Sequence, residues 1–255
     1  MKLLLINPNT SECVTARLHS AAAAVASLDT EIIPVTAKKG VPYISTRAEE
    51  LIGGQVVLEV LSEKSANADG AIVAAFGDPG LGGAREMFDI PVIGLAEAGM
   101  VTASMLGRNF SIVTFATALG SWYQECVDWH KLSSRCVSIR TLDKPFTSIN
   151  DVGEEKEDLL AELANDAVVR DGADVVVLAG APLAGLASRV RDRIPVPVVD
   201  CAEAAIKQLE LLVALKFRKA ESGNFMRPAA KESVGLTAAL AARLAHKDGH
   251  GSLNS

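Results

Sequence analysis

The chain has 255 residues, of which 49% are hydrophobic and 22% charged, and its formal net charge is −6. A chain of this length buries one substantial core or two smaller ones, and its composition excludes intrinsic disorder, which combines low hydrophobicity with high net charge. The acidic balance argues against nucleic acid or an anionic membrane as a partner.

The first predicted elements are a strand, a helix and a second strand. Leu3 to Ile6 form an apolar run that is too short for the hydrophobic region of a signal peptide, because the polar segment NPNTS follows it at once. We expect this run to be the first core strand, with a helix over about 11–26 and a strand at EIIPV. No stretch holds the roughly 18 apolar residues that cross a bilayer, so we expect a cytoplasmic protein.

Further along the chain, apolar strands run into glycine-rich or hydroxyl-bearing loops. The segment 68–83 (ADGAIVAAFGDPGLGG) is a strand that ends at Ala75 and enters a glycine-rich turn. SIVTFAT at 111–117 is an apolar strand that runs into threonines, and ADVVVLAGAPLAGLA at 173–187 is one that runs into glycines. Because such strands alternate with helical patterns, the sequence predicts parallel sheets covered by helices.

The two halves of the sequence resemble each other. Aligning the two glycine-rich segments places Ala75 on Gly180, and the next segments, PVIGLAEA and PVPVVDCAEA, place Glu97 on Glu203. Upstream, LLLINPNT aligns with SIVTFAT. Three matched segments in the same order predict an α/β protein of two similar flavodoxin-like domains, with parallel sheets of roughly four strands related by a pseudo-twofold axis.

The repeat also sets the expected domain limits. We expect the first domain to comprise residues 1–98 together with 205–245, the second to comprise 99–204, and the tail 246–255 to be disordered. Ligands of parallel sheets bind beyond the carboxyl ends of the strands. If the two sheets face each other, an active-site cleft for a small molecule lies between the domains.

The loops at this expected cleft offer polar groups to a ligand. In NPNTS, Thr10 or Ser11 is a credible helix N-cap and Asn9 offers an amide, although a plain capped turn explains the segment equally well. FGDPGLGG at 76–83 presents successive backbone N–H groups at a helix start, which suits a carboxylate or an oxyanion. It lacks the Lys-Ser/Thr ending of a nucleotide-binding loop.

Five side chains near these loops have two interpretations each. Thr114 and Thr117 can bind a carboxylate or serve as ordinary strand threonines. Tyr43 can reach the cleft or pack against the first sheet. Asp78 and Glu97 can take part in proton transfer, or they can cap and stabilise helix starts.

The sequence predicts neither a metal nor a cofactor. The 4 cysteines form no C-x-x-C pair, and the 4 histidines are scattered without metal-ligand spacing. Cys201 follows a predicted strand, where a buried and inert thiol is favoured over a thiol near the cleft.

Six segments together resemble the aspartate/glutamate/hydantoin racemase superfamily, and most closely its hydantoin and allantoin racemase branch. In chain order they are INPNTS, AIVAAFGDPGL, PVIGLAEAGM, FSIVT, DVVVLAGAPLAGL and PVPVVD, and they cover nearly the whole chain. The resemblance implies two domains with pseudo-twofold symmetry, a small carboxylate or cyclic ureide substrate in the cleft between them, and a homo-oligomer.

The resemblance also implies where catalytic thiols belong. In this family one cysteine sits in the context ACF-DPGL and another in GCAGMAGL. One thiolate removes a proton from the acidic carbon of the substrate, and the opposite thiol returns a proton to the other face. These positions correspond to Ala75 and Gly180 in this sequence, and neither residue can accept a proton.

Three interpretations of the missing thiols stay open. In the first, the protein is a one-cysteine enzyme in an inactive form, in which alanine replaces the cysteine at position 75. A single thiol suits a lyase, isomerase or hydrolase reaction. In the second, a diverged enzyme uses Asp78, Tyr43, Glu97 or a bound water instead. In the third, the protein binds a small anion or ureide without turnover.

A common binding frame follows from the resemblance in all three cases. Backbone amides near 76–77 and 180–182 are expected to hold carboxylate or imide oxygens, as an oxyanion hole does. Pro182 removes one such amide where the family has glycine, which argues against hydantoin or allantoin itself. The residues expected around the ligand are Asn9, Phe76, Gly77, Thr114, Thr117, Gly180, Ala181 and Pro182.

Overall fold

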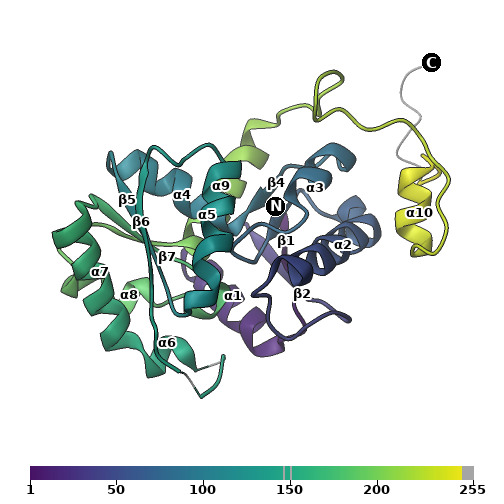
Figure 1. Cartoon of the computed structure of the whole chain (residues 1–255). Helices are drawn as coiled ribbons and strands as arrows, with labels where there is room; N and C mark the ends of the chain where they lie inside the picture. The colour runs from purple at the N-terminus through teal and green to yellow at the C-terminus, as the bar shows by residue number, and fades with distance from the viewer. Residues whose placement is uncertain (146, 150, 249–255) are drawn as a thin grey trace.

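Two four-stranded parallel sheets organise the chain, one in each half of the sequence (Figure 1). The computed structural model describes residues 1–145, 147–149 and 151–248. The strand order is β2-β1-β3-β4 in the first sheet and β6-β5-β7-β8 in the second, so the predicted α/β class and paired sheets are confirmed. The strands are β1 (Lys2–Asn7), β2 (Glu31–Thr36), β3 (Gly70–Val73), β4 (Val92–Gly94), β5 (Phe110–Thr114), β6 (Cys136–Thr141), β7 (Val175–Leu178) and β8 (Val198–Asp200).

Helices connect consecutive strands, as parallel pairing requires. No helix in the described part of the chain is long and apolar enough to cross a membrane. The helices are α1 (Glu12–Val25), α2 (Arg47–Lys64), α3 (Leu81–Met87), α4 (Leu95–Leu106), α5 (Gly120–Trp129), α6 (Val152–Glu155), α7 (Glu157–Asp171), α8 (Ala187–Val190), α9 (Cys201–Leu215) and α10 (Ala238–Leu244), and short 3₁₀ turns include η2 (Thr117–Leu119) and η3 (Ala181–Leu183).

The first sheet is covered on both faces, which explains why its strands are continuous apolar runs. Successive side chains of a strand point to opposite faces. Leu3 and Leu5 of β1 therefore pack in a core that includes residues of α1 and α9, whereas Leu4 and Ile6 pack in a second core with residues of α2 and α3. All four residues of β3 and all four of β7 are buried.

The strand registers confirm the internal repeat. In the first sheet the pairing of β1 with β3 begins with Leu3 opposite Gly70. In the second sheet the pairing of β5 with β7 begins with Phe110 opposite Val175. These equivalent registers carry the chain into equivalent loops after β3 and β7. The loop tips that the sequence aligns therefore occupy matching positions at the carboxyl ends of the two sheets.

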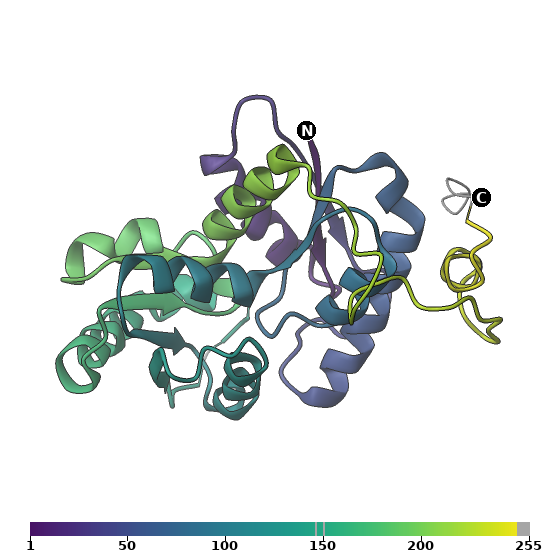
Figure 2. The same ribbon diagram turned by 90° about the horizontal axis from the view of Figure 1, so that it is seen from above.

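Helices α4 and α9 pack against each other where the two halves meet (Figure 2). A Cβ atom on Gly99 of α4 would lie only 2.5 Å from Cys201 Sγ, so the glycine allows this close approach. Gln208 of α9 donates hydrogen bonds to Ala98 O (2.9 Å) and Thr102 Oγ1 (2.8 Å). The contact is therefore both packed and hydrogen-bonded.

The expected domain limits remain a prediction. The limit between 204 and 205 falls inside the continuous helix α9, which also contacts α1 and β3 of the first half. A long connection leads from α9 to α10, which packs against α2 (Figure 1). Of the expected disordered tail, 246–248 follow α10 directly, and 249–255 lie outside the described residues.

Glu210 anchors α9 to the first half of the chain. Its carboxylate accepts hydrogen bonds from Ser27 N (2.7 Å) and Thr30 Oγ1 (2.6 Å), and Lys207 Nζ lies 2.8 Å away. Burial alone would raise the pKa of Glu210, but the hydrogen bonds from Lys207, Thr30 and Ser27 lower it to about 2. These hydrogen bonds therefore stabilise the ionised Glu210 carboxylate in the folded state relative to the unfolded state.

The Glu210→Gln substitution is expected to lower the free energy of unfolding by roughly 2 kcal/mol at pH 7. A group with a lowered folded-state pKa stabilises the fold above its unfolded pKa, and this contribution disappears as pH falls from about 5 toward 2. Urea unfolding at a series of pH values should therefore give a shallower loss of stability for the variant. The exposed residue Glu63 supplies the control Glu63→Gln, and identical pH slopes for Glu210→Gln and wild type would contradict the expectation.

A carboxylate in the first half ties the loop after β3 to the helix after β4. Asp78 adopts a left-handed backbone conformation (φ +52°) and accepts hydrogen bonds from Ala96 N (2.8 Å) and Glu97 N (2.9 Å) in the first turn of α4. A Cβ atom on Gly94 would lie 2.1 Å from the Asp78 carboxyl carbon. The glycine before α4 is therefore required for this interaction.

The second half has an equivalent link, but its carboxylate belongs to the end of the fourth strand rather than to the loop after the third strand. Asp200, the last residue of β8, accepts a hydrogen bond from Ala202 N (2.9 Å) in α9. Its second oxygen accepts one from Gly185 N (2.6 Å) in the loop after β7. Each half thus joins its third-strand loop to its fourth-strand helix through one buried aspartate.

Asp78→Ala and Asp200→Ala are each expected to lower the free energy of unfolding by about 1–2 kcal/mol or more, because each leaves helix N-terminal amides without an acceptor. Chemical denaturation measures the change. Asp192→Ala, at an exposed site in the second half, is the matched control and should stay within about 0.5 kcal/mol of wild type. A loss as small as that of the control in both variants would argue against the two links.

Candidate active site

The loops after β1, β3 and β7 meet at a small cavity between the two sheets. Its volume is about 20 Å³, which is room for roughly one water molecule. A ring-sized ligand therefore requires these loops to move apart. The cavity is lined by Asn9, Tyr43, Ile44, Ala75, Phe76, Tyr123, Gly180, Ala181 and Pro182.

The two loop tips that the sequence aligns, Ala75 and Gly180, both line this cavity. Ala75 is 6% exposed, carries a Cβ atom and is not among the residues with a positive φ. Gly180 has φ +112°, a conformation that L-residues rarely adopt. A Cβ atom on Gly180 would also lie 2.8 Å from the ring of Phe115. The two loop tips therefore have equivalent topology, but a side chain fits at position 75 and is opposed at position 180.

Two tyrosine hydroxyls face the same cavity region. Burial, with a smaller contribution from Glu49, raises the pKa of Tyr43 above its ordinary value, and burial raises that of Tyr123 likewise. Both phenols are therefore neutral hydrogen-bond donors at neutral pH. Among the described residues the Tyr43 hydroxyl is one of the few buried polar groups without a hydrogen-bond partner. Its ring lies 5.9 Å from that of Phe115, so it contacts the second half of the chain rather than only the first sheet.

The three polar residues expected at the strand ends lie in three different environments. Asn9 lines the cavity, and its Oδ1 accepts hydrogen bonds from Asn7 Nδ2 and Ser11 N, both at 2.9 Å. The Thr114 hydroxyl donates to Ala179 O (2.9 Å), and Thr114 is not among the described residues that line the cavity. Thr117 lies in η2 at an exposed position, with its hydroxyl 3.4 Å from Leu142 O.

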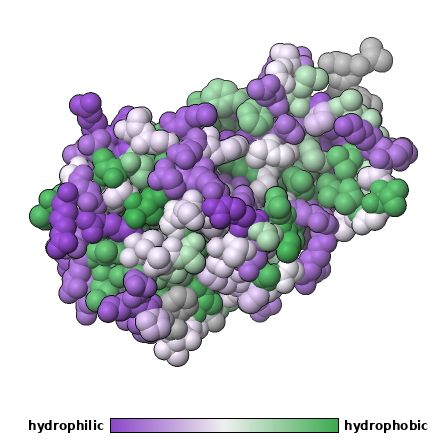
Figure 3. Space-filling model, viewed as in Figure 1, coloured by the Kyte–Doolittle hydropathy of each residue, from purple (hydrophilic) through white to green (hydrophobic). Residues whose placement is uncertain are grey.

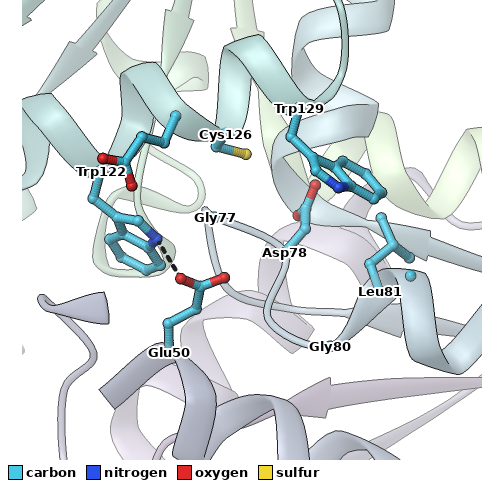
Figure 4. Close-up of a pocket in the computed structure, with 10 residues that line it drawn as sticks. Glu50, Gly77, Asp78, Gly80, Leu81, Trp122, Cys126 and Trp129 are labelled. Atoms are coloured by element: carbon cyan, nitrogen blue, oxygen red, sulfur yellow. Dashed lines mark hydrogen bonds between the residues drawn. The ribbon is translucent and has the colours of Figure 1, made fainter. Parts of the chain in front are cut away.

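A second, larger cavity of about 300 Å³ is lined by Gly77 and Asp78 of the same loop after β3 (Figure 4). Helix α5 contributes Trp122 and Cys126 to one wall. Glu50 of α2 faces them and accepts a hydrogen bond from Trp122 Nε1 (3.0 Å). Burial raises the pKa of Glu50 above its ordinary value. The lining residues are Glu50, Gly77, Asp78, Gly80, Leu81, Gly82, Trp122, Glu125, Cys126 and Trp129.

Two predicted site residues line this larger cavity, and a third lines neither cavity. Gly77 and Asp78 line the larger cavity, and the Asp78 carboxylate is held by the α4 amides. Glu97 lines neither, because it pairs with Arg85, whose Nη1 lies 3.0 Å from Glu97 Oε1. In this structure Asp78 is engaged with α4 and Glu97 with Arg85, and the expectation that either transfers protons in the cleft stays a prediction.

The sequence interpretation missed several residues that the fold brings to these cavities. Tyr123 stacks on Phe76 with ring centroids 4.4 Å apart. Cys126 and His130 are four residues apart near the end of α5, and with Asp78 they place metal-ligating atoms within 4.8 Å of one another. The Cys-x-x-x-His spacing was a signal for a shared helical face, but the third member comes from a distant loop.

The comparisons with known proteins agree with this architecture. The family model for Asp/Glu/Hydantoin racemase matches residues 3–209. The chain is 32% identical over 236 residues to the hydantoin racemase of Pseudomonas sp. (strain NS671), covering 92% of this chain and 95% of that protein. It is 30% identical to the hydantoin racemase of Paenarthrobacter aurescens, with 91% and 99% covered.

Solved structures give the same result. The allantoin racemase from Klebsiella pneumoniae superposes with a TM-score of 0.88 at 34% identity, over 94% of this chain and 98% of that chain. An arylmalonate decarboxylase superposes with a TM-score of 0.60 at 16% identity, over 88% and 99%, and so shares the fold alone. From its sequence and its structure, this chain belongs to the Asp/Glu/hydantoin racemase family.

Proposed function

We propose that this protein binds a small cyclic ureide in the cavity between its two halves, in a site that accommodates one acid–base group at position 75 instead of two. The hydantoin and allantoin racemases to which the chain is similar act, by their names, on ligands of this class. A carbon acid of this kind carries an acidic proton next to a carbonyl group, and removing it creates an enolate-like charge that needs hydrogen-bond donors.

The observation that carries this proposal is the difference between the two loop tips. Position 75 already holds a Cβ atom beside the cavity, so a cysteine there adds only a sulfur atom. At position 180 the backbone angle and the ring of Phe115 both oppose a side chain. A thiol therefore fits on one face of a bound ring and not on the other.

The donors for the ligand come from both halves of the chain. Tyr43 lines the cavity, and its buried hydroxyl, which has no hydrogen-bond partner, is available as a neutral donor. Ala181 opens the short helix η3, and the first N–H groups of a helix have no acceptor within it. Pro182 has no N–H, so this loop offers one donor fewer than a Gly-containing loop. We therefore expect binding of a ring with one strongly held carbonyl oxygen.

We expect the Ala75→Cys variant to exchange the acidic hydrogen of an enantiopure 5-substituted hydantoin for deuterium in D₂O, at least about tenfold faster than the chain with alanine. A single thiolate removes and returns the proton on one face, so the product should keep its configuration. Proton NMR follows the exchange and chiral chromatography follows the configuration. Buffer without protein corrects for spontaneous exchange.

Two matched variants make this test specific. Ala74→Cys places the same thiol one residue earlier, in the buried core, and should show no exchange above the alanine protein. Gly180→Cys should lower the free energy of unfolding by about 1–3 kcal/mol because it forces a side chain into a left-handed conformation. Rapid racemisation by Ala75→Cys, or a stable Gly180→Cys variant, would contradict the one-face site.

The small cavity favours a second candidate function, which is ligand binding without turnover. None of the described cysteines, aspartates or glutamates lines it. Saturable binding of a ureide by calorimetry, combined with no exchange even in Ala75→Cys, would support this candidate over the first. A diverged lyase, isomerase or hydrolase that relies on Asp78 or Glu97 is not favoured, because neither lines the cavity. The homo-oligomer and the cytoplasmic location stay predictions.

A further inference from the structure

Three metal-ligating side chains from distant segments meet beside the larger cavity. Cys126 lies on α5 and His130 directly follows this helix, while Asp78 comes from the loop after β3. One donor atom from each lies within 4.8 Å of those of the other two. The side chains of His130 and Asp78 are only 4% and 2% exposed, with His130 Nε2 2.9 Å from Asp78 Oδ2. None of these residues is needed for ligand binding in the small cavity.

We propose that Asp78, Cys126 and His130 bind a divalent cation of the zinc class. A thiolate, an imidazole and a carboxylate form the mixed donor set that zinc prefers, and the thiol disfavours magnesium and calcium. Donors bound to a tetrahedral zinc ion lie about 3.5 Å apart, given bond lengths of about 2.0–2.3 Å. The donor atoms of the cluster lie within 4.8 Å of one another, so binding requires side-chain rotation wherever a pair is farther apart than the separation around zinc.

Neighbouring groups surround two of these side chains. Glu97 Oε1 lies 3.9 Å from His130 Nδ1, the ring nitrogen that faces away from Asp78. Arg85 fixes Glu97 in turn through a hydrogen bond of 3.0 Å. A metal-binding histidine commonly donates its other ring N–H to a carboxylate. At 3.9 Å Glu97 is a neighbouring carboxylate that would have to move closer to accept such a hydrogen bond. Asp78 is itself fixed by two backbone amides of α4.

The surroundings also favour a cation with an open coordination position. Asp78 and Cys126 line the cavity of about 300 Å³, and Figure 4 shows the Cys126 sulfur and the Asp78 carboxylate on the same side of it. Its described lining includes the carboxylates of Glu50 and Glu125 as well and contains no basic side chain. Three protein ligands with a solvent-facing fourth position are typical of zinc sites that bind water or a ligand.

The first experiment measures metal binding by the full chain. Protein stripped with a chelator is dialysed against zinc and, separately, titrated with cobalt(II). We expect about one zinc per chain by mass spectrometry of the metal content, and a thiolate-to-cobalt charge-transfer band in the near ultraviolet. Absence of that band at saturating cobalt would overturn the proposal, and this readout uses the unmodified protein.

Substitutions then locate the ion. Cys126→Ala and His130→Gln should each abolish the cobalt band or weaken zinc affinity at least about 100-fold against a chromophoric chelator, and Glu97→Gln should weaken it roughly 10-fold. Cys136→Ala removes a thiol outside the cluster and should leave both readouts unchanged. Circular dichroism verifies that each variant is folded. Equal zinc binding by Cys136→Ala and Cys126→Ala would place the ion elsewhere and overturn the assignment.

Discussion

The position of the candidate site depends on two buried aspartates, each of which joins a loop to the start of a helix. Asp78 reaches from the loop after β3 to the amides of α4, and Asp200 holds both the start of α9 and the loop after β7. A carboxylate is favourable at a helix N-terminus because it meets unpaired N–H groups and the positive end of the helix dipole. Since α4 and α9 pack against each other, the two loops on either side of the cavity are anchored to the same pair of helices.

The same architecture is used twice, but the two copies differ at the residues that face the ligand. Strand order and register are equivalent in the two halves. The loop after β3 places a Cβ atom of Ala75 beside the cavity, whereas the loop after β7 passes Gly180 in a left-handed conformation under the ring of Phe115. A fold duplicated in the chain therefore need not be duplicated in its chemistry, because one backbone angle decides whether a side chain fits.

The parts of the structure that follow from local pattern could be predicted from the sequence. Strands buried on both faces appear as uninterrupted apolar runs, and the carboxyl-end rule placed Asn9, Ala75 and Gly180 around one cavity. The direction of individual polar side chains could not be predicted. The Thr114 hydroxyl satisfies a buried carbonyl, and the positive φ of Asp78 turns its carboxylate toward α4. Both outcomes depend on unpaired backbone groups in other elements, which the local sequence does not contain.

The contribution of α5 depends on tertiary packing in the same way. Tyr123 reaches the small cavity, whereas Cys126 lines the larger one, and the loop from Ala75 to Asp78 separates them. Ala75 and Phe76 face the first cavity and Gly77 and Asp78 the second, so a displacement of this loop changes both cavities at once. A cation held by Asp78 would restrain the loop that carries Ala75. Opening of the small cavity for a ring-sized ligand would then have to come mainly from the opposite loop around Gly180, where the glycine backbone is least restricted.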